Sequence, residues 1–107
     1  MVIDGMRRVH PGEVLREDFL VPLKLSPNAL AMALRVPATR IHEIVNERRS
    51  VTAETAIRLA RYFSTSAEMW MNLQSSYDLH RAYEAHGAEV DAGIKPLGAE
   101  SDQVRSP

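Results

Sequence analysis

The feature that most limits how this chain can fold is a pair of prolines, Pro27 and Pro37, each at the start of a short amphipathic pattern. Proline fixes φ near −65° and lacks an N–H, so it opens a helix well and interrupts one badly. Ser26 is a good N-cap for a helix that begins at Pro27, and Pro37 must end that helix and can open the next. Apolar residues follow at helical spacing: Leu30, Ala31 and Leu34 in the first segment, and Ile41, Ile44 and Val45 in the second. Two short helices joined by a turn of three or four residues predict a helix-turn-helix.

A further helix is expected ahead of this pair. It should begin at Pro11, with His10 as an N-terminal cap or packing residue, and run to about Leu20. Pro22 disfavours helical geometry at Val21, so we expect the helix to end there.

Two more helices are expected behind the pair, and no strand pattern is convincing. Thr52 is the predicted cap of the fourth helix, and the capping box Thr65-x-x-Glu68 should open the fifth. Gly87 is the expected terminator of that fifth helix. The inward-facing residues would be Ala56, Leu59, Ala60 and Phe63 in the fourth helix, and Trp70 and Leu73 in the fifth.

The 107 residues divide into three expected parts. Residues 1–8 should form a flexible N-terminal arm, residues 9–87 the helix-turn-helix domain, and residues 88–107 a flexible acidic tail without aromatic residues. The predicted fold is therefore all-α, a compact five-helix bundle of lambda-repressor-like type.

The formal net charge is −1, but the charge is unevenly distributed. Residues 35–61 contain six Arg against three Glu, a balance of +3, whereas residues 84–107 contain five acidic residues against Lys95 and Arg105, a balance of −3. Only the local charge acts on a phosphate backbone within a Debye length of about 10 Å. The basic middle of the chain is therefore compatible with DNA binding.

The second helix of the pair, expected over residues 38–48, carries polar side chains opposite its apolar side. At 100° per residue, Thr39, Glu43 and Asn46 lie outward, with Arg40 and His42 on the flanks. Asn can pair with adenine, Arg with guanine or phosphate, Glu with cytosine, and Thr with a phosphate or a thymine methyl group. Arg48 and Arg49, at the helix end and into the loop, suit phosphate contacts. The alternative is that this polar face is only exposed to solvent and has no binding role. The helix-turn-helix spacing and the local positive charge favour DNA binding over that alternative.

Other kinds of site find little support. The chain has no cysteine, its four histidines lack chelating spacing, and no nucleophile elbow or phosphate-binding glycine loop is present. We expect no metal, no cofactor and no enzymatic activity. The apolar run Phe19–Leu23 is far shorter than the roughly 20 residues that a bilayer requires, and no hydrophobic segment follows the first charges. A cytoplasmic protein without a signal peptide is expected.

Several stretches together resemble the HigA-type antitoxins, the VapI/HigA branch of the Xre/lambda-repressor-like helix-turn-helix family. They are HPGE at 10–13, VPATRIHEIVNERR at 36–49, TAETAIRLARYF at 52–63 and AEMWMNLQ at 67–74. The resemblance covers about residues 7–83. It implies a repressor of its own operon that also neutralises a HigB-like toxin, a small RelE-related ribonuclease that cleaves mRNA.

The resemblance also assigns DNA-reading roles. These would fall on Asn28, Thr39, Arg40 and Asn46, with Arg48 or Arg49 near phosphates. The chain departs from the family pattern twice: Asn28 replaces the usual Gln, and Arg35 replaces the usual Gly of the turn. If the turn is left-handed, Arg35 costs about 1 kcal/mol relative to Gly.

Two other functions stay open: an orphan repressor without a toxin, and a protein-interaction module that has lost DNA binding. A single helix-turn-helix usually contacts too little DNA for tight specific binding, so we expect a homodimer that reads an inverted repeat. Met71 and Tyr83 could lie at the dimer seam or at a toxin contact. An acidic patch at Glu13, Glu17 and Asp18 is a further candidate surface for the toxin.

Overall fold

The computed structural model describes residues 7–98, which form five helices and no strand. The first is continuous and consists of α1 (Pro11–Val14), the π-helical segment η1 (Leu15–Leu20) and α2 (Val21–Leu23). It is followed by α3 (Pro27–Leu34), α4 (Ala38–Val45), α5 (Ala53–Phe63) and α6 (Ala67–Gly93). The all-α class is confirmed.

The core lies where α1 to α5 and the first turns of α6 meet. Trp70 is fully buried, and the Phe19 ring packs against both Trp70 and Phe63, with ring centroids 5.4 and 4.7 Å apart. Leu73 is half-buried against this core, as expected. The apolar side chains predicted for the helix pair are all buried: Leu30, Ala31, Leu34, Ile41, Ile44 and Val45.

Serine and threonine caps define the starts of α3, α5 and α6. The Ser26 hydroxyl accepts from the Ala29 N–H and the Thr52 hydroxyl from the Thr55 N–H, as predicted. The predicted cap of α6 is wrong. Ser66, not Thr65, is the N-cap, because the Thr65 hydroxyl accepts a 2.8 Å hydrogen bond from the indole N–H of buried Trp70.

The first helix does not end before Pro22, contrary to the sequence prediction. It continues to Leu23, and Lys24 ends it in the left-handed conformation with φ of 54°. The backbone of η1 is widened, so that the Val21 N–H donates to the carbonyl of Arg16 five residues earlier. This wider turn changes the carbonyl geometry that makes a proline clash inside a regular α-helix. Pro22 therefore lies in the last turn without ending the helix.

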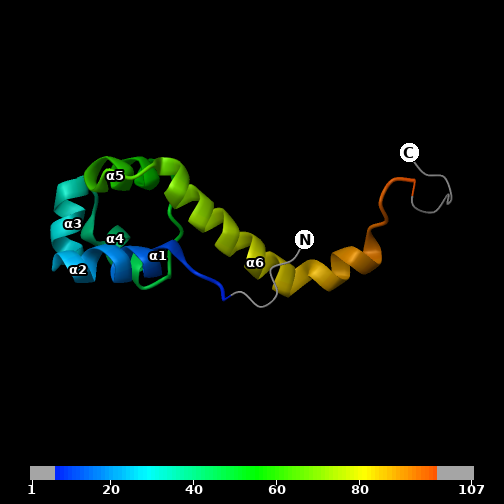
Figure 1. The fold of residues 1–107 in the computed structure, drawn as a ribbon. Coiled ribbons are helices and arrows are strands. Elements are labelled where there is room, and N and C mark those ends of the chain that lie inside the picture. The colour runs from blue at the N-terminus through cyan, green and yellow to red at the C-terminus, as the bar shows by residue number, and fades with distance from the viewer. Residues whose placement is uncertain (1–6, 99–107) are drawn as a thin grey trace.

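Helix α6 is longer than expected and gives the molecule its shape. It passes through Gly87 and ends at Gly93, so residues 88–93, expected to be part of a flexible tail, are helical. Figure 1 shows α1 to α5 gathered at one end and the C-terminal half of α6 projecting away from them. The molecule measures 60 × 22 × 22 Å. The bundle is thus compact only as far as the first half of α6. Residues 1–6, in the expected N-terminal arm, and residues 99–107, in the expected tail, lie outside the described residues.

Candidate DNA-binding interface

The turn between α3 and α4 has the geometry that the sequence suggested. Arg35 adopts φ of 61° and ψ of 47°, the left-handed conformation in which glycine is favoured, and it ends α3. Pro37 caps α4 in an extended conformation. Helix α4 is shorter than the predicted 38–48, because it ends at Val45 and the chain reverses at Glu47 with φ of 63°.

Three of the predicted contact residues lie together on the solvent side of this unit. Thr39 and His42 are exposed on α4, and Asn46 is exposed as its C-cap. The His42 Nε2 atom lies 2.9 Å from the Oδ1 atom of Asn28, in the first turn of α3. This hydrogen bond joins Asn28 to the outward face of α4, so that one polar surface includes side chains from both helices.

Arg40 is oriented towards α5 instead of outward. Its guanidinium lies 3.3 Å from the Glu54 carboxylate and 3.5 Å from the Thr55 hydroxyl, and its side chain is 25% exposed. Arg58 also binds Glu54, and these two arginines, Arg58 foremost, lower the pKa of the Glu54 carboxyl group. Arg40 therefore links α4 to the start of α5, at the edge of the polar surface.

The other charged candidates lie beside the end of α4. The Arg49 guanidinium donates to the Glu43 carboxylate at 2.7 Å, so these two candidates are paired with each other. Arg48 lies beyond the helix and is exposed, and no ion pair involves it within residues 7–98. Of the two arginines suited to phosphates, Arg48 is therefore the one whose charge is uncompensated.

Sequence reasoning missed the residue that holds the end of α4. Arg16 donates to the backbone carbonyl of Val45, and its guanidinium also lies 3.3 Å from Glu47 and 2.9 Å from Glu17. A cation is favourable at a helix C-terminus, where carbonyl groups lack partners. No local pattern reveals this contact, since 29 residues separate Arg16 from Val45.

Gly12 and His10 fix how closely the first helix approaches α4. A Cβ atom at Gly12 would overlap the carbonyl of Ile44, so only glycine fits there. The buried His10 ring accepts a 2.8 Å hydrogen bond at Nδ1 from the Gly12 N–H and packs edge-on against Tyr77. Burial lowers the pKa of His10 below its ordinary value of 6.5. The sequence prediction that His10 caps this helix is confirmed.

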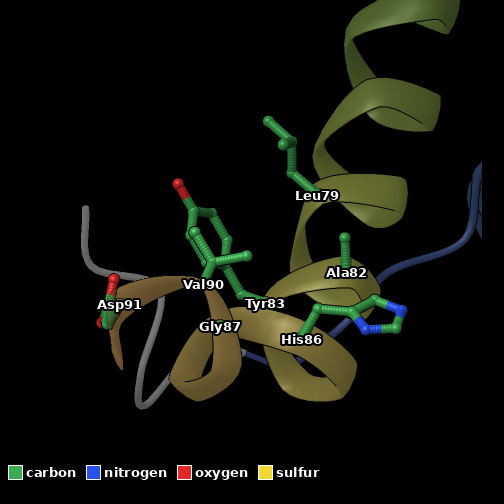
Figure 2. Close-up of a pocket in the computed structure, with 7 residues that line it drawn as sticks. All are labelled: Leu79, Ala82, Tyr83, His86, Gly87, Val90 and Asp91. Atoms are coloured by element: carbon green, nitrogen blue, oxygen red, sulfur yellow. The ribbon is translucent and has the colours of Figure 1, made fainter. Parts of the chain in front are cut away.

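A second exposed surface lies on the projecting half of α6. Figure 2 shows Leu79, Tyr83 and Val90 on the same side of the helix, around a shallow apolar hollow. These three side chains are about half exposed. Met71, a sequence candidate for the dimer seam or a toxin contact, is instead half-buried against the core.

The described part of the chain offers neither a metal site nor a membrane-spanning helix. Residues 7–98 contain no group of three or more histidine, cysteine or carboxylate side chains that could hold a metal ion. Among the same residues, no helix has both the length and the apolar character needed to cross a membrane.

Comparison with known proteins gives consistent matches over most of the chain. A helix-turn-helix family model matches residues 15–70. The chain is 54% identical over 77 residues to virulence-associated protein I of Dichelobacter nodosus, which covers 72% of this chain and 71% of that protein. It is 32% identical over 97 residues to antitoxin HigA-1 of Vibrio cholerae, and the match covers 91% of this chain and 90% of that protein. The solved structure of Pseudomonas aeruginosa antitoxin HigA with the higBA promoter matches with a TM-score of 0.84 and 53% identity, covering 85% of this chain and 99% of that one.

Proposed function

Because the chain belongs to the helix-turn-helix family, and within it to the HigA antitoxins, we propose that it represses its own operon and neutralises a HigB-like toxin that cleaves mRNA. Its partners would be double-stranded operator DNA and the toxin, and it would act in the cytoplasm. No cofactor or catalytic step enters this proposal.

The observation that carries the DNA part is the polar surface formed by α4 and the first turn of α3. Thr39, His42 and Asn46 are exposed on it, and Asn28 is bonded to His42. Such side chains can contact base edges in the major groove. Arg40, Glu43, Arg48 and Arg49 surround this surface, where we assign them to phosphate contact and to positioning.

We infer a homodimer from the area that one unit can offer to DNA. A single module of this size buries about 600–1,000 Å² of protein surface on DNA, and two recognition helices about 34–36 Å apart would read an inverted repeat. Leu79, Tyr83 and Val90 on α6 supply an apolar surface for the dimer seam. This surface lies on the projecting half of the helix, so pairing there leaves α4 free to contact DNA (Figure 1).

The toxin would bind on the exposed side of the first helix, at the acidic patch of Glu13, Glu17 and Asp18. Within the acidic patch of the first helix, Glu13 pairs with Arg7 at 2.8 Å and Glu17 with Arg16 at 2.9 Å. Asp18 is exposed and has no ion pair within residues 7–98, so it is the uncompensated carboxylate of the patch. A basic RNA-cleaving toxin would meet Asp18 there.

Titration of a fluorescent operator duplex tests the DNA-binding surface. Asn46→Ala should weaken binding by about 1–3 kcal/mol if Asn46 contacts a base edge. Asn72→Ala is the matched control, because it makes the same change at an exposed position of α6. Binding should also weaken steeply with salt, since Arg side chains displace condensed counterions.

The outcomes separate the candidate functions. If Thr39→Ala, Arg40→Ala and Asn46→Ala all keep full operator affinity, the recognition surface is misplaced. If the wild-type protein binds no operator, the protein-interaction module is favoured. An orphan repressor would bind the operator while no adjacent toxin gene product binds the protein.

A further inference from the structure

A carboxylate on α5 draws Arg40 away from the polar surface, although Arg40 is one of the residues assigned to phosphate contact. The Nη1 atom of Arg40 lies 3.3 Å from the Oε1 atom of Glu54. Glu54 is the second residue of α5, after the N-cap Thr52, and its side chain is 58% exposed. Carboxylates and phosphates are both strong acceptors for a guanidinium group. Glu54 is therefore in a position to compete with DNA for Arg40.

Glu54 has a second and closer partner, so it does not depend on Arg40. Arg58, four residues further along α5, lies 3.0 Å from Glu54 through Nη2 and donates to it through Nε at 3.1 Å. The two arginines bind different oxygens of the carboxylate, because Arg40 contacts Oε1 and Arg58 contacts Oε2. The N-terminus of α5 also stabilises a negative charge in its first turn. Glu54 thus remains paired if Arg40 leaves it.

The other partner of Arg40 is also independent of it. The Thr55 hydroxyl lies 3.5 Å from Arg40 Nη1, beyond the usual hydrogen-bond range of about 2.7–3.2 Å. Thr55 is buried, so its hydroxyl needs a partner, and the Thr52 hydroxyl supplies one at 3.3 Å. Departure of Arg40 therefore leaves neither Glu54 nor Thr55 unpaired, and its cost is that of one partly exposed ion pair.

Arg40 lies close enough to the polar surface to exchange one acceptor for the other. It directly follows the exposed Thr39 on α4, and an arginine side chain has several staggered rotamers, including ones that point away from α5. Glu43, three residues further along α4, is a neighbour on the helix surface. It does not compete for Arg40, because it is paired with Arg49 at 2.7 Å. Glu54 is thus the carboxylate that decides where Arg40 points.

We propose that Glu54 is a positioning residue that competes with operator DNA for Arg40. It holds Arg40 on α5 in the free protein and gives Arg40 up to a phosphate when α4 enters the major groove, while Arg58 keeps Glu54 paired. The inference rests on the proposed function and adds to it a residue that opposes binding. Operator affinity is therefore lower than the arginines at this edge would allow, and Glu54 sets the difference.

A double-mutant cycle in the operator titration tests this competition. Glu54→Gln removes the charge and keeps the size of the side chain, so it should tighten operator binding about threefold, as expected for loss of one exposed ion pair. In an Arg40→Gln background the same change should have little effect, because no guanidinium group is released. The control is Glu68→Gln, which makes the same change at the second residue of α6 and should leave operator affinity unchanged.

The outcomes separate this role from its alternatives. Equal tightening in both backgrounds would show that Glu54 acts only by repelling phosphates. Weaker binding by Glu54→Gln would show that Glu54 orients Arg40 towards the DNA. Either result overturns the competition and leaves the proposed function intact, whereas a wild-type protein without operator affinity would overturn both. The difference between the two backgrounds should also diminish as salt is raised, because salt screens the ion pair, whereas a purely structural effect on α5 would persist.

Discussion

Arg35 occupies the left-handed position at the end of α3, where a side chain brings the Cβ atom close to the carbonyl oxygen. Arg35→Gly should therefore raise the free energy of unfolding by about 1 kcal/mol, a gain reduced by the greater backbone entropy that glycine loses on folding. The measurement is urea denaturation of both proteins. Arg48→Gly, at a residue whose φ is not positive, is the control and should not stabilise the protein. Equal destabilisation by both changes would show that the turn is not strained.

His10 makes the stability of the fold dependent on pH. Burial lowers the pKa of His10 in the folded protein, so the unfolded chain binds the proton more readily. The stabilising contribution of neutral His10 should be complete above pH 6.5 and decrease as the pH falls below that value. Urea denaturation between pH 5 and pH 8 measures this decrease.

His10→Asn is the control for this titration. Asparagine keeps an acceptor for the Gly12 N–H at the N-cap and cannot take up a proton in this range. The variant should show a smaller decrease in stability below pH 6.5. An unchanged pH profile would mean that His10 titrates alike in the folded and unfolded chain.

Among the helices, α3 and α5 were predictable because their signals are local. Ser26, Pro27 and Thr52 act on the backbone within three residues of themselves. The two wrong predictions, the helix end before Pro22 and the Thr65 cap of α6, depend on features beyond the local sequence pattern. The wider turn of η1 accommodates Pro22, and the core residue Trp70 takes the hydroxyl that would otherwise cap α6.

Glycine alone also does not end a helix. At Gly87 the backbone continues as helix, at a cost of about 1 kcal/mol relative to alanine. In the candidate site, the outward positions of Thr39 and Asn46 followed from periodicity, whereas Glu43, expected outward, is half-buried and His42, expected on a flank, is exposed. The pairing of Arg40 with Glu54 and the support from Arg16 depend on how the helices pack, which periodicity does not specify.

The C-terminal part of α6 gives a prediction about the role of this element. Residues 88–97 are exposed in the protomer, so truncation after Gly87 should change its free energy of unfolding by less than about 1 kcal/mol. The same truncation removes Val90, which belongs to the apolar surface assigned to the dimer seam, so it should weaken the dimer. Thermal unfolding of dilute protein and light scattering measure the two effects separately. A loss of more than about 2 kcal/mol in the monomer would show that this segment supports the core.

For the whole molecule, the proposed surfaces for DNA and toxin are separate. Asn46→Ala should weaken repression of the operon while co-expression still rescues growth from the adjacent toxin. Asp18→Lys should do the reverse, because it places a positive charge where a basic toxin would bind. A promoter-reporter assay and a growth assay on the same strains measure both functions. Loss of rescue by a folded Asn46→Ala protein would show that the two functions share a surface.

The hydrogen bond between Asn28 and His42 has a consequence for how operator preference evolves. A substitution at position 28 releases the His42 ring, so it changes base reading through a residue that has not itself mutated. The effect of a change at either position then depends on the other, and single steps pass through poorly binding intermediates. Relatives with diverged operators should accordingly differ at both positions together, and the paired exchange should transfer operator choice where either exchange alone does not.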